Sequence, residues 1–248
     1  MGRKPNTKDA PHRTKSGRSA HSQSEPQSSK TETEGSAYDR AIEAAGGEKY
    51  LAAAKVIESL PRAVRPNSRV TTKVNAAVRD AEEAALRQHA VTEELLHDSA
   101  QFELQWKAQG EMGGAENDII YDELTGLVWK RNRIDVMHLS WRQFFERMLA
   151  HNLYFPEAPL RLEGFVESEA GLCPLFTQPD VHAVSGAIRS VVEPFMRERG
   201  YARKGFDDYH SELLAVEDLH EGNVLIDEDG CLHVIDPVIF AKNRIISA

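Results

Sequence analysis

The spacing of hydrophobic residues predicts strands and helices between residues 110 and 248. Two short runs, 118–122 and 125–130, are bounded by turn residues and predict a β-hairpin. The segment 140–153 predicts a helix, because a serine N-cap and a glutamine three residues later form a capping-box pattern. Its apolar residues recur at helical spacing: Trp141, Phe144, Phe145, Met148 and Leu149.

The same reasoning extends to the end of the chain. A second strand pair is predicted at 160–167 and 172–177, and a helix at 185–199 that stops before a glycine. Two further strands, 223–227 and 231–236, are joined by an Asp-Gly turn. We therefore expect an α+β domain in this half of the chain.

The first half of the chain has a different pattern. Residues 37–109 are rich in Ala, Glu, Leu and Arg, with a break at Gly46-Gly47, and the stretch 70–107 has neither Pro nor Gly. We expect helices here that pack against another part of the chain. Residues 1–36 carry seven Lys or Arg, four Asp or Glu and almost no apolar side chains, which predicts a disordered tail. The expected parts are thus a tail (1–36), a helical region (37–109) and an α+β domain (110–248).

Charge and composition narrow the function classes. The chain has 30 Lys and Arg against 39 Asp and Glu, a net charge of −9, so no extensive nucleic-acid interface is expected. No apolar run approaches the roughly 18 residues that span a bilayer, so no membrane partner is expected. Cys173 and Cys231 form no metal or disulfide pattern, which favours free thiols and a cytoplasmic location.

The residues that could carry chemistry lie near the carboxyl end. Asp218 and Asn223 have D-x-x-x-x-N spacing, which predicts that one tight loop holds both. Asp236 follows 13 residues after Asn223, where the predicted hairpin brings its carboxylate back to that loop. Phosphoryl transfer needs such a set: one carboxylate that orients the acceptor hydroxyl, and an amide oxygen and a second carboxylate that hold a divalent metal.

This pattern resembles the catalytic and metal-binding segments of the protein-kinase-like superfamily. The run Asp-Leu-His-Glu-Gly-Asn at 218–223 is most similar to small-molecule kinases of the aminoglycoside- and choline-kinase type. A wider set of segments, 152–157, 162–165 and 177–179, is similar to the kinase domain found in polyvalent proteins of phages and conjugative elements. The resemblance covers roughly residues 110–240 and implies a reduced protein-kinase-like fold, with an N-lobe sheet, an abbreviated C-lobe and preceding helices.

The resemblance also implies ATP and Mg²⁺ as cofactors and gives each matching residue a role. Asp218 is the implied catalytic carboxylate, and Asn223 and Asp236 are the implied metal ligands. Lys130 is the implied lysine for the α- and β-phosphates, and Glu146 on the next helix is its implied ion-pair partner. The remaining implied contacts are a phosphate-covering glycine segment and an adenine-binding hinge: Gly110, Gly113 and Gly114, then Thr177, Gln178, Asp180 and Val181.

Some of these residues also fit plainer interpretations. Lys130 lies beside arginines and fits an exposed lysine on an edge strand, and Glu146 lies off the apolar face of its helix and fits a solvated charge. Asn152 lies near the middle of that face, which indicates a buried amide or a site residue. His220 is expected to make a structural hydrogen bond rather than to act as a base.

Two departures from protein kinases bear on the function. Val216-Glu217 stands where protein kinases have His-Arg, and only 12 residues follow Asp236, so we expect no peptide-binding platform. The expected function is transfer of the ATP γ-phosphoryl group to a hydroxyl of a small-molecule or protein acceptor. The alternative is a catalytically inactive kinase-like module that binds nucleotide or acts as an adaptor in a mobile-element system. A helical scaffold with an incidental hairpin stays open as a third interpretation.

Overall fold

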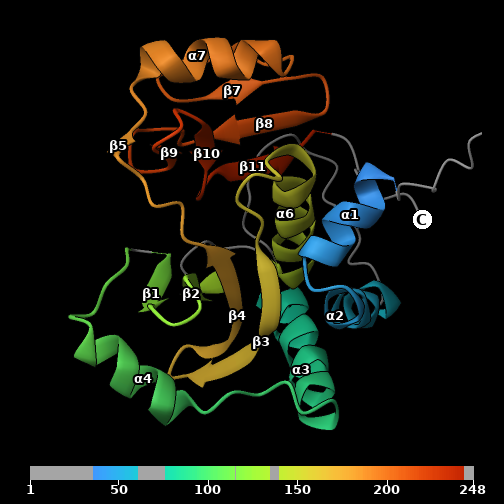
Figure 1. The fold of residues 1–248 in the computed structure, drawn as a ribbon. Helices are drawn as coiled ribbons and strands as arrows, with labels where there is room; N and C mark the ends of the chain where they lie inside the picture. Colours follow the sequence, from blue (N-terminus) through green and yellow to red (C-terminus); the bar gives the residue numbers. More distant parts are fainter. Residues whose placement is uncertain (1–35, 61–75, 115, 135–139, 243–248) are drawn as a thin grey trace, which may run out of the picture. The chain divides into compact units, whose positions relative to one another are not determined.

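Helices and antiparallel sheets together form an α+β structure, as the sequence predicts (Figure 1). The computed structural model describes residues 36–60, 76–114, 116–134 and 140–242, all within one compact unit of the chain. Apart from Ser36, the predicted tail lies outside the described residues. Within these residues, none of the helices has the length and apolar character needed to cross a membrane.

Among the described residues, four helices precede the first strand. Gly46-Gly47 separates the first two, as predicted. Within the stretch predicted to hold one or more long helices, the structure has two, because the Asp98 carboxylate accepts hydrogen bonds from the N–H groups of Ala100 and Gln101 and starts a new helix. The four helices are α1 (Ala37–Ala44), α2 (Glu48–Ser59), α3 (Ala76–Thr92) and α4 (Ser99–Ala108).

A four-stranded antiparallel sheet follows, with strand order β1-β2-β4-β3. Both predicted hairpins are confirmed, the first between β1 and β2 and the second between β3 and β4. The helix predicted at 140–153 is also confirmed, and it lies between β2 and β3 in the chain. These elements are β1 (Asn117–Asp122), β2 (Leu127–Asn132), α6 (Trp141–Tyr154), β3 (Arg161–Ser168) and β4 (Gly171–Pro179).

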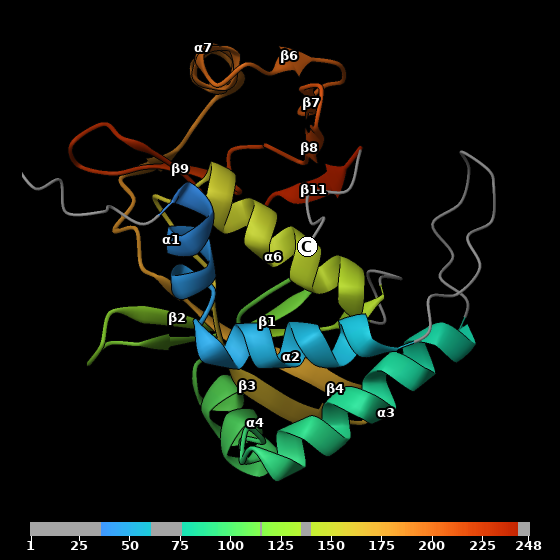
Figure 2. The ribbon, with the colours of Figure 1, turned by 90° about the vertical axis from the view of Figure 1, so that its right-hand side faces the viewer.

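Helices cover both faces of this sheet. Successive strand residues point to opposite faces, so Phe176 packs with the aromatic residues of α6 while Leu175 packs with Phe102 of α4. α1, α2 and α3 pack beside α6 and complete the larger core (Figure 2). Asn152 is a buried amide, one of the two expected possibilities, and both donates to and accepts from the backbone of Leu160 at 2.7 Å.

The C-terminal part contains two small sheets, β10-β9-β5 and β11-β8-β7-β6. The predicted hairpin is confirmed as β9 and β10. The predicted helix 185–199 is wrong at its start, because residues 185 and 186 pair with β9 and the helix begins at Arg189. The elements are β5 (Ser185–Gly186), α7 (Arg189–Glu198), β6 (Ala202–Arg203), β7 (Tyr209–His210), β8 (Leu214–Glu217), β9 (Val224–Ile226), β10 (Leu232–Val234) and β11 (Val238–Ala241).

Gly164 gives a test of how tightly the chain packs against β3. Its φ is +156°, and a Cβ there would lie 2.3 Å from the carbonyl oxygen of Leu95. We expect Gly164→Ala to lower the free energy of unfolding by about 1–3 kcal/mol, because backbone must move to make room. Gly114→Ala is the control, since its Cβ would meet nothing within 4 Å. Urea unfolding measures both, and equal losses would contradict the packing argument.

Candidate active site

Asp218 and Asn223 lie on the loop between β8 and β9. The amide Nδ2 of Asn223 donates to Oδ2 of Asp218 at 3.0 Å and to the carbonyl oxygen of Asp218 at 2.9 Å. In the same loop, Nδ1 of His220 accepts from the N–H of Gly222 at 2.9 Å. The loop is therefore as tight as its spacing predicts, and the structural hydrogen bond expected of His220 is confirmed.

The backbone of Asp218 has an unusual conformation. Its φ is +64°, which residues other than glycine adopt rarely. The next residue anchors the loop, because Leu219 is buried and its N–H donates to the carbonyl of Asp207 at 3.0 Å. Such strained positions concentrate at functional sites, where the surrounding structure maintains them. The side chain of Asp218 is about half exposed, at 54%, and so is accessible to a substrate.

Asp236 follows β10 and is connected both to the loop and to the larger sheet. The N–H of Ile235 donates to the carbonyl of Asn223 at 2.9 Å. Nζ of Lys130 donates to the carbonyl of Ile235 at 3.3 Å. Lys130 therefore contacts the segment that carries Asp236, and that segment is hydrogen-bonded to Asn223.

Lys130 is a buried residue of a central strand. It is 3% exposed, and β2 lies between β1 and β4, so the interpretation as an exposed edge-strand lysine is wrong. Burial lowers the pKa of its ammonium, and the negative charge of Asp236 acts in the opposite direction. The nearby carboxylate that favours the charged form of this lysine is therefore Asp236.

Glu146 lies on α6, and its charge acts on the neighbouring helices. It adds to the burial that raises the pKa values of Tyr50 on α2 and Glu82 on α3. The charge that acts on the Lys130 ammonium is that of Asp236. The pairing of Lys130 with Glu146 stays a prediction.

The glycine segment lies close to the site. Gly113 forms an isolated antiparallel bridge with Asp118, and the N–H of Gly114 donates to the carbonyl of Asn117 at 2.9 Å. This turn leads directly into Asn117, which contacts Asp236. Gly110 lies apart from the turn, because its N–H donates to the carbonyl of Lys107 at the end of α4.

The predicted hinge is partly a strand. Thr177 and Gln178 belong to β4, are each 2% exposed and donate their side-chain hydrogen bonds to Glu163 and to the carbonyl of Ala158. Asp180 follows the strand, and its N–H donates to the carbonyl of Gly126 at 3.0 Å. Val181 comes next and is half-buried.

Asn117 was not identified from the sequence, although it contacts a predicted metal ligand. Its Nδ2 donates to Oδ2 of Asp236 at 3.2 Å, and its Oδ1 accepts from Nδ2 of Asn132 at 2.9 Å. The second bond fixes the amide so that its N–H₂ group faces Asp236. No sequence motif includes this residue. The one feature that could have pointed to it is its position three residues after Gly114 of the glycine segment.

Glu116 and Arg147 also belong to the charged surroundings of Asp236. Burial raises the pKa of Glu116, and Asp236 and Asp218 raise it further, while Arg147 lowers it. The guanidinium of Arg147 lies 4.5 Å above the ring of Phe240 on β11. It is therefore positioned over the strand that follows Asp236.

His151 lies four residues after Arg147 on α6, on the same side of the helix. It is 2% exposed, its Nε2 lies 2.8 Å from the carbonyl of Ala158, and its Nδ1 has no hydrogen-bond partner among the described residues. Burial lowers its pKa to about 4. The positive charge of Lys130 also lowers this pKa, whereas the negative charge of Asp236 raises it. The pair at positions 147 and 151 could have been noticed as two polar residues at helical spacing.

The acidic residues do not form a metal site by themselves. Within the described residues, no group of three or more His, Cys, Asp or Glu side chains could hold a metal ion. Kinases need fewer protein ligands, because one carboxylate and one amide oxygen bind metal together with the nucleotide phosphates. Asn223 and Asp236 supply these two ligand types.

These features, an α+β fold and a sheet lysine in contact with an aspartate-bearing segment, fit the kinase-like class of domain. Comparison with protein families agrees: the serine/threonine/tyrosine kinase found in polyvalent proteins matches residues 79–243, more than half of the chain. The chain belongs to this family, which confirms the resemblance seen in the sequence. The match begins within α3, ahead of the boundary expected at residue 110. No curated protein and no solved structure matches the chain.

Asn117 gives the first test of the site. In Asn117→Asp, a buried carboxylate would lie against the half-buried Asp236, and two carboxylates in contact repel unless one binds a proton. We expect the free energy of unfolding to fall by about 1–3 kcal/mol at pH 8 and to recover toward pH 5, where protonation relieves the repulsion. Asn117→Ala is the uncharged control, and an equal pH dependence of the two variants in urea unfolding would contradict the contact.

His151 gives a second test through pH. Its imidazole stays neutral in the folded protein down to about pH 4, whereas the unfolded chain binds the proton near pH 6.5. Stability is therefore lost as the pH falls through this window, by about 3 kcal/mol. We expect His151→Gln to reduce this loss, as measured by urea unfolding at pH 7 and pH 4.5. His182→Gln, at an exposed position, should keep the full loss, and a His151→Gln variant that also keeps it would refute the assignment.

Proposed function

We propose that the chain is an ATP-dependent phosphotransferase with a reduced kinase-like fold. The observation that carries the proposal is the contact between Lys130 and the carbonyl of Ile235, next to Asp236. In protein kinases the nucleotide-binding lysine lies on a sheet strand, with the metal-binding aspartate across the cleft. The order of elements supports the same comparison, because the lysine strand β2 is followed by α6, and the loop of Asp218 is followed by a hairpin and then Asp236.

The hydrogen bonds orient the proposed ligands. Nδ2 of Asn223 is engaged by Asp218, so Oδ1 of Asn223 is the atom left to bind a cation. Oδ2 of Asp236 accepts from Asn117, so Oδ1 of Asp236 is the other atom left to bind a cation. Asn223 and Asp236 would therefore hold Mg²⁺, which when bound would neutralise charge on the triphosphate.

The proposed reaction gives each residue one task. Lys130 donates hydrogen bonds to the α- and β-phosphates. Asp218 accepts the proton of the acceptor hydroxyl as its oxygen forms a bond to the γ-phosphorus. The bond from that phosphorus to the β,γ-bridging oxygen breaks, and ADP leaves.

A second candidate function is a catalytically inactive kinase-like module that binds nucleotide or acts as an adaptor. One observation favours it: the charge that acts on the Lys130 ammonium is that of Asp236, whereas in active protein kinases the corresponding lysine pairs with a glutamate of the next helix.

ATP turnover distinguishes these candidates. We expect Asp218→Asn to lower kcat by about 100-fold or more, because the acceptor proton loses its base. Asp236→Asn should in addition abolish the thermal stabilisation by Mg-ATP, which is about 2.7 kcal/mol at 100 times Kd. Asp229→Asn, in the exposed turn between β9 and β10, is the matched control.

Each outcome has a distinct meaning. Transfer of radiolabel that survives Asp218→Asn would refute the proposed base. Stabilisation by Mg-ATP without any transfer would favour the inactive module. If Mg-ATP neither stabilises the chain nor supports transfer, the phosphotransferase and the nucleotide-binding module are both refuted, and an adaptor that binds no nucleotide is left.

A further inference from the structure

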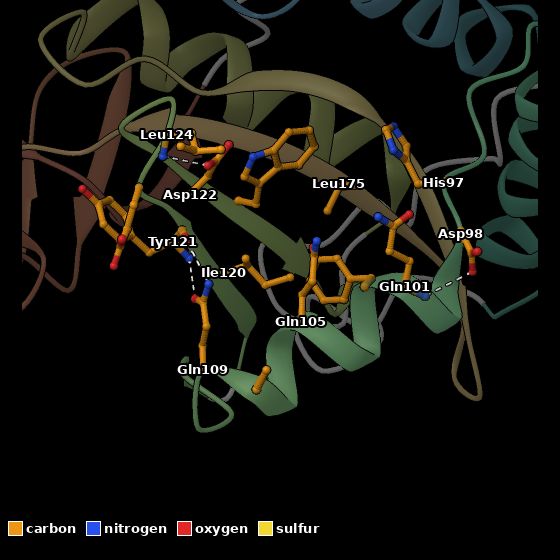
Figure 3. Close-up of a pocket in the computed structure, with 14 residues that line it drawn as sticks. His97, Asp98, Gln101, Gln105, Gln109, Ile120, Tyr121, Asp122, Leu124 and Leu175 are labelled. Atoms are coloured by element: carbon orange, nitrogen blue, oxygen red, sulfur yellow. Dashed lines mark hydrogen bonds between the residues drawn. The ribbon is translucent and has the colours of Figure 1, made fainter.

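A cavity of about 630 Å³ lies between α4 and the sheet (Figure 3). Its volume is in the range of sites for small molecules. The cavity is lined by apolar residues of the small core under α4: Phe102, Ile120, Trp129 and Leu175. It therefore offers an apolar surface on which a small organic ligand can pack.

This cavity is on the opposite face of the sheet from the proposed active site. Trp129, which lines it, and Lys130 are neighbours on β2, so their side chains point to opposite faces. Neither Lys130 nor Asp236 is among the residues that line the cavity. A molecule bound there would leave the nucleotide cleft open.

Two amide side chains of α4 face the cavity. Gln101 and Gln105, one helical turn apart, rise from α4 toward the sheet in Figure 3. Within the described part of the chain, neither side-chain amide forms a hydrogen bond. Gln109, a further turn along, differs: its amide bonds both the N–H and the C=O of Tyr121 at 2.8 Å. Gln109 thus covers the edge of β1, while Gln101 and Gln105 can bond a ligand.

The charged side chains that line the cavity are acidic. Among the described residues, Asp98, Asp122 and Glu123 line it, and no Lys or Arg does. The guanidinium of Arg131 lies 4.7 Å from the ring of Phe102 but is paired with Glu103 and Asp118. The hydroxyl of Thr125 and the N–H of Leu124 lower the pKa of Asp122, which keeps it ionised at neutral pH. An aromatic ring and carboxylates together attract organic cations and repel anions such as nucleotides.

We propose that this cavity is a binding site for a small organic cation, with its apolar body against Trp129 and its ammonium or guanidinium group toward Asp122 and Glu123. Gln101 and Gln105 supply hydrogen bonds at the side of the ligand. The site is separate from phosphoryl transfer and does not depend on whether the chain is active.

A charge series of probes with the same body tests the proposal. Phenethylamine, 2-phenylethanol and phenylacetate are positive, neutral and negative, and ligand-observed NMR measures their binding to the full chain. We expect phenethylamine to bind best, with roughly a two- to five-fold step to the neutral probe, and phenylacetate to bind worst. Equal binding of the three probes, or no binding of phenethylamine, would overturn the proposal.

Variants place the probe in this cavity. Glu123→Gln should reduce the preference for phenethylamine over 2-phenylethanol, whereas Glu228→Gln, an exposed carboxylate of another hairpin turn, should not. Gln105→Trp, at an exposed helix position, should fill the cavity and weaken binding of all probes. A variant that kept wild-type binding after Gln105→Trp would refute the site.

Two further measurements distinguish this cavity from the nucleotide cleft and from a peptide-binding surface. Mg-ATP should leave the affinity for phenethylamine unchanged, and competition between them would locate the probe in the nucleotide cleft and overturn the assignment. A pentalysine peptide is the macromolecular comparison. Strong binding of this peptide without binding of phenethylamine would show a peptide surface instead of a small-molecule site.

Discussion

The buried ammonium of Lys130 is the constraint on which the candidate site depends. A charge in the middle of a sheet costs several kcal/mol unless a partner offsets the loss of hydration. The partners here are the carbonyl of Ile235 and the negative charge of Asp236. The larger sheet is therefore held against the segment that follows β10, and any rearrangement that separates them must leave a buried charge without compensation.

Sequence reasoning succeeded where the signal is local. The apolar face of α6 and the turn between β9 and β10 are each determined by residues close together in the sequence, and both predictions are confirmed. The spacing of Asp218 and Asn223 predicts a tight loop for the same reason, since five residues leave the chain little freedom. The family was identified from this segment together with the segments 152–157, 162–165 and 177–179.

The contacts that sequence reasoning missed join distant parts of the chain. β8 and β11 are four-residue strands whose pairing depends on the hairpin between them, so neither has a pattern of its own. Asn117 reaches Asp236 across 119 positions, and only the fold shows the contact. Glu146 lies on the helix after Lys130, and only the fold shows that its charge raises the pKa values of Tyr50 on α2 and Glu82 on α3.

The sum of charges around Asp236 bears on what the proposed site can bind. Four acidic side chains face two basic ones here, so the negative charges are in excess. The acidic ones are Glu116, Glu217, Asp218 and Asp236, and the basic ones are Lys130 and Arg147. Glu217 stands where protein kinases have an arginine, and here Arg147 brings a guanidinium near it from α6. Such charges would repel a bare triphosphate, whereas a divalent cation on the proposed ligands Asn223 and Asp236 would reverse the local field. Nucleotide binding at this site should therefore depend on the metal more steeply than on either basic side chain.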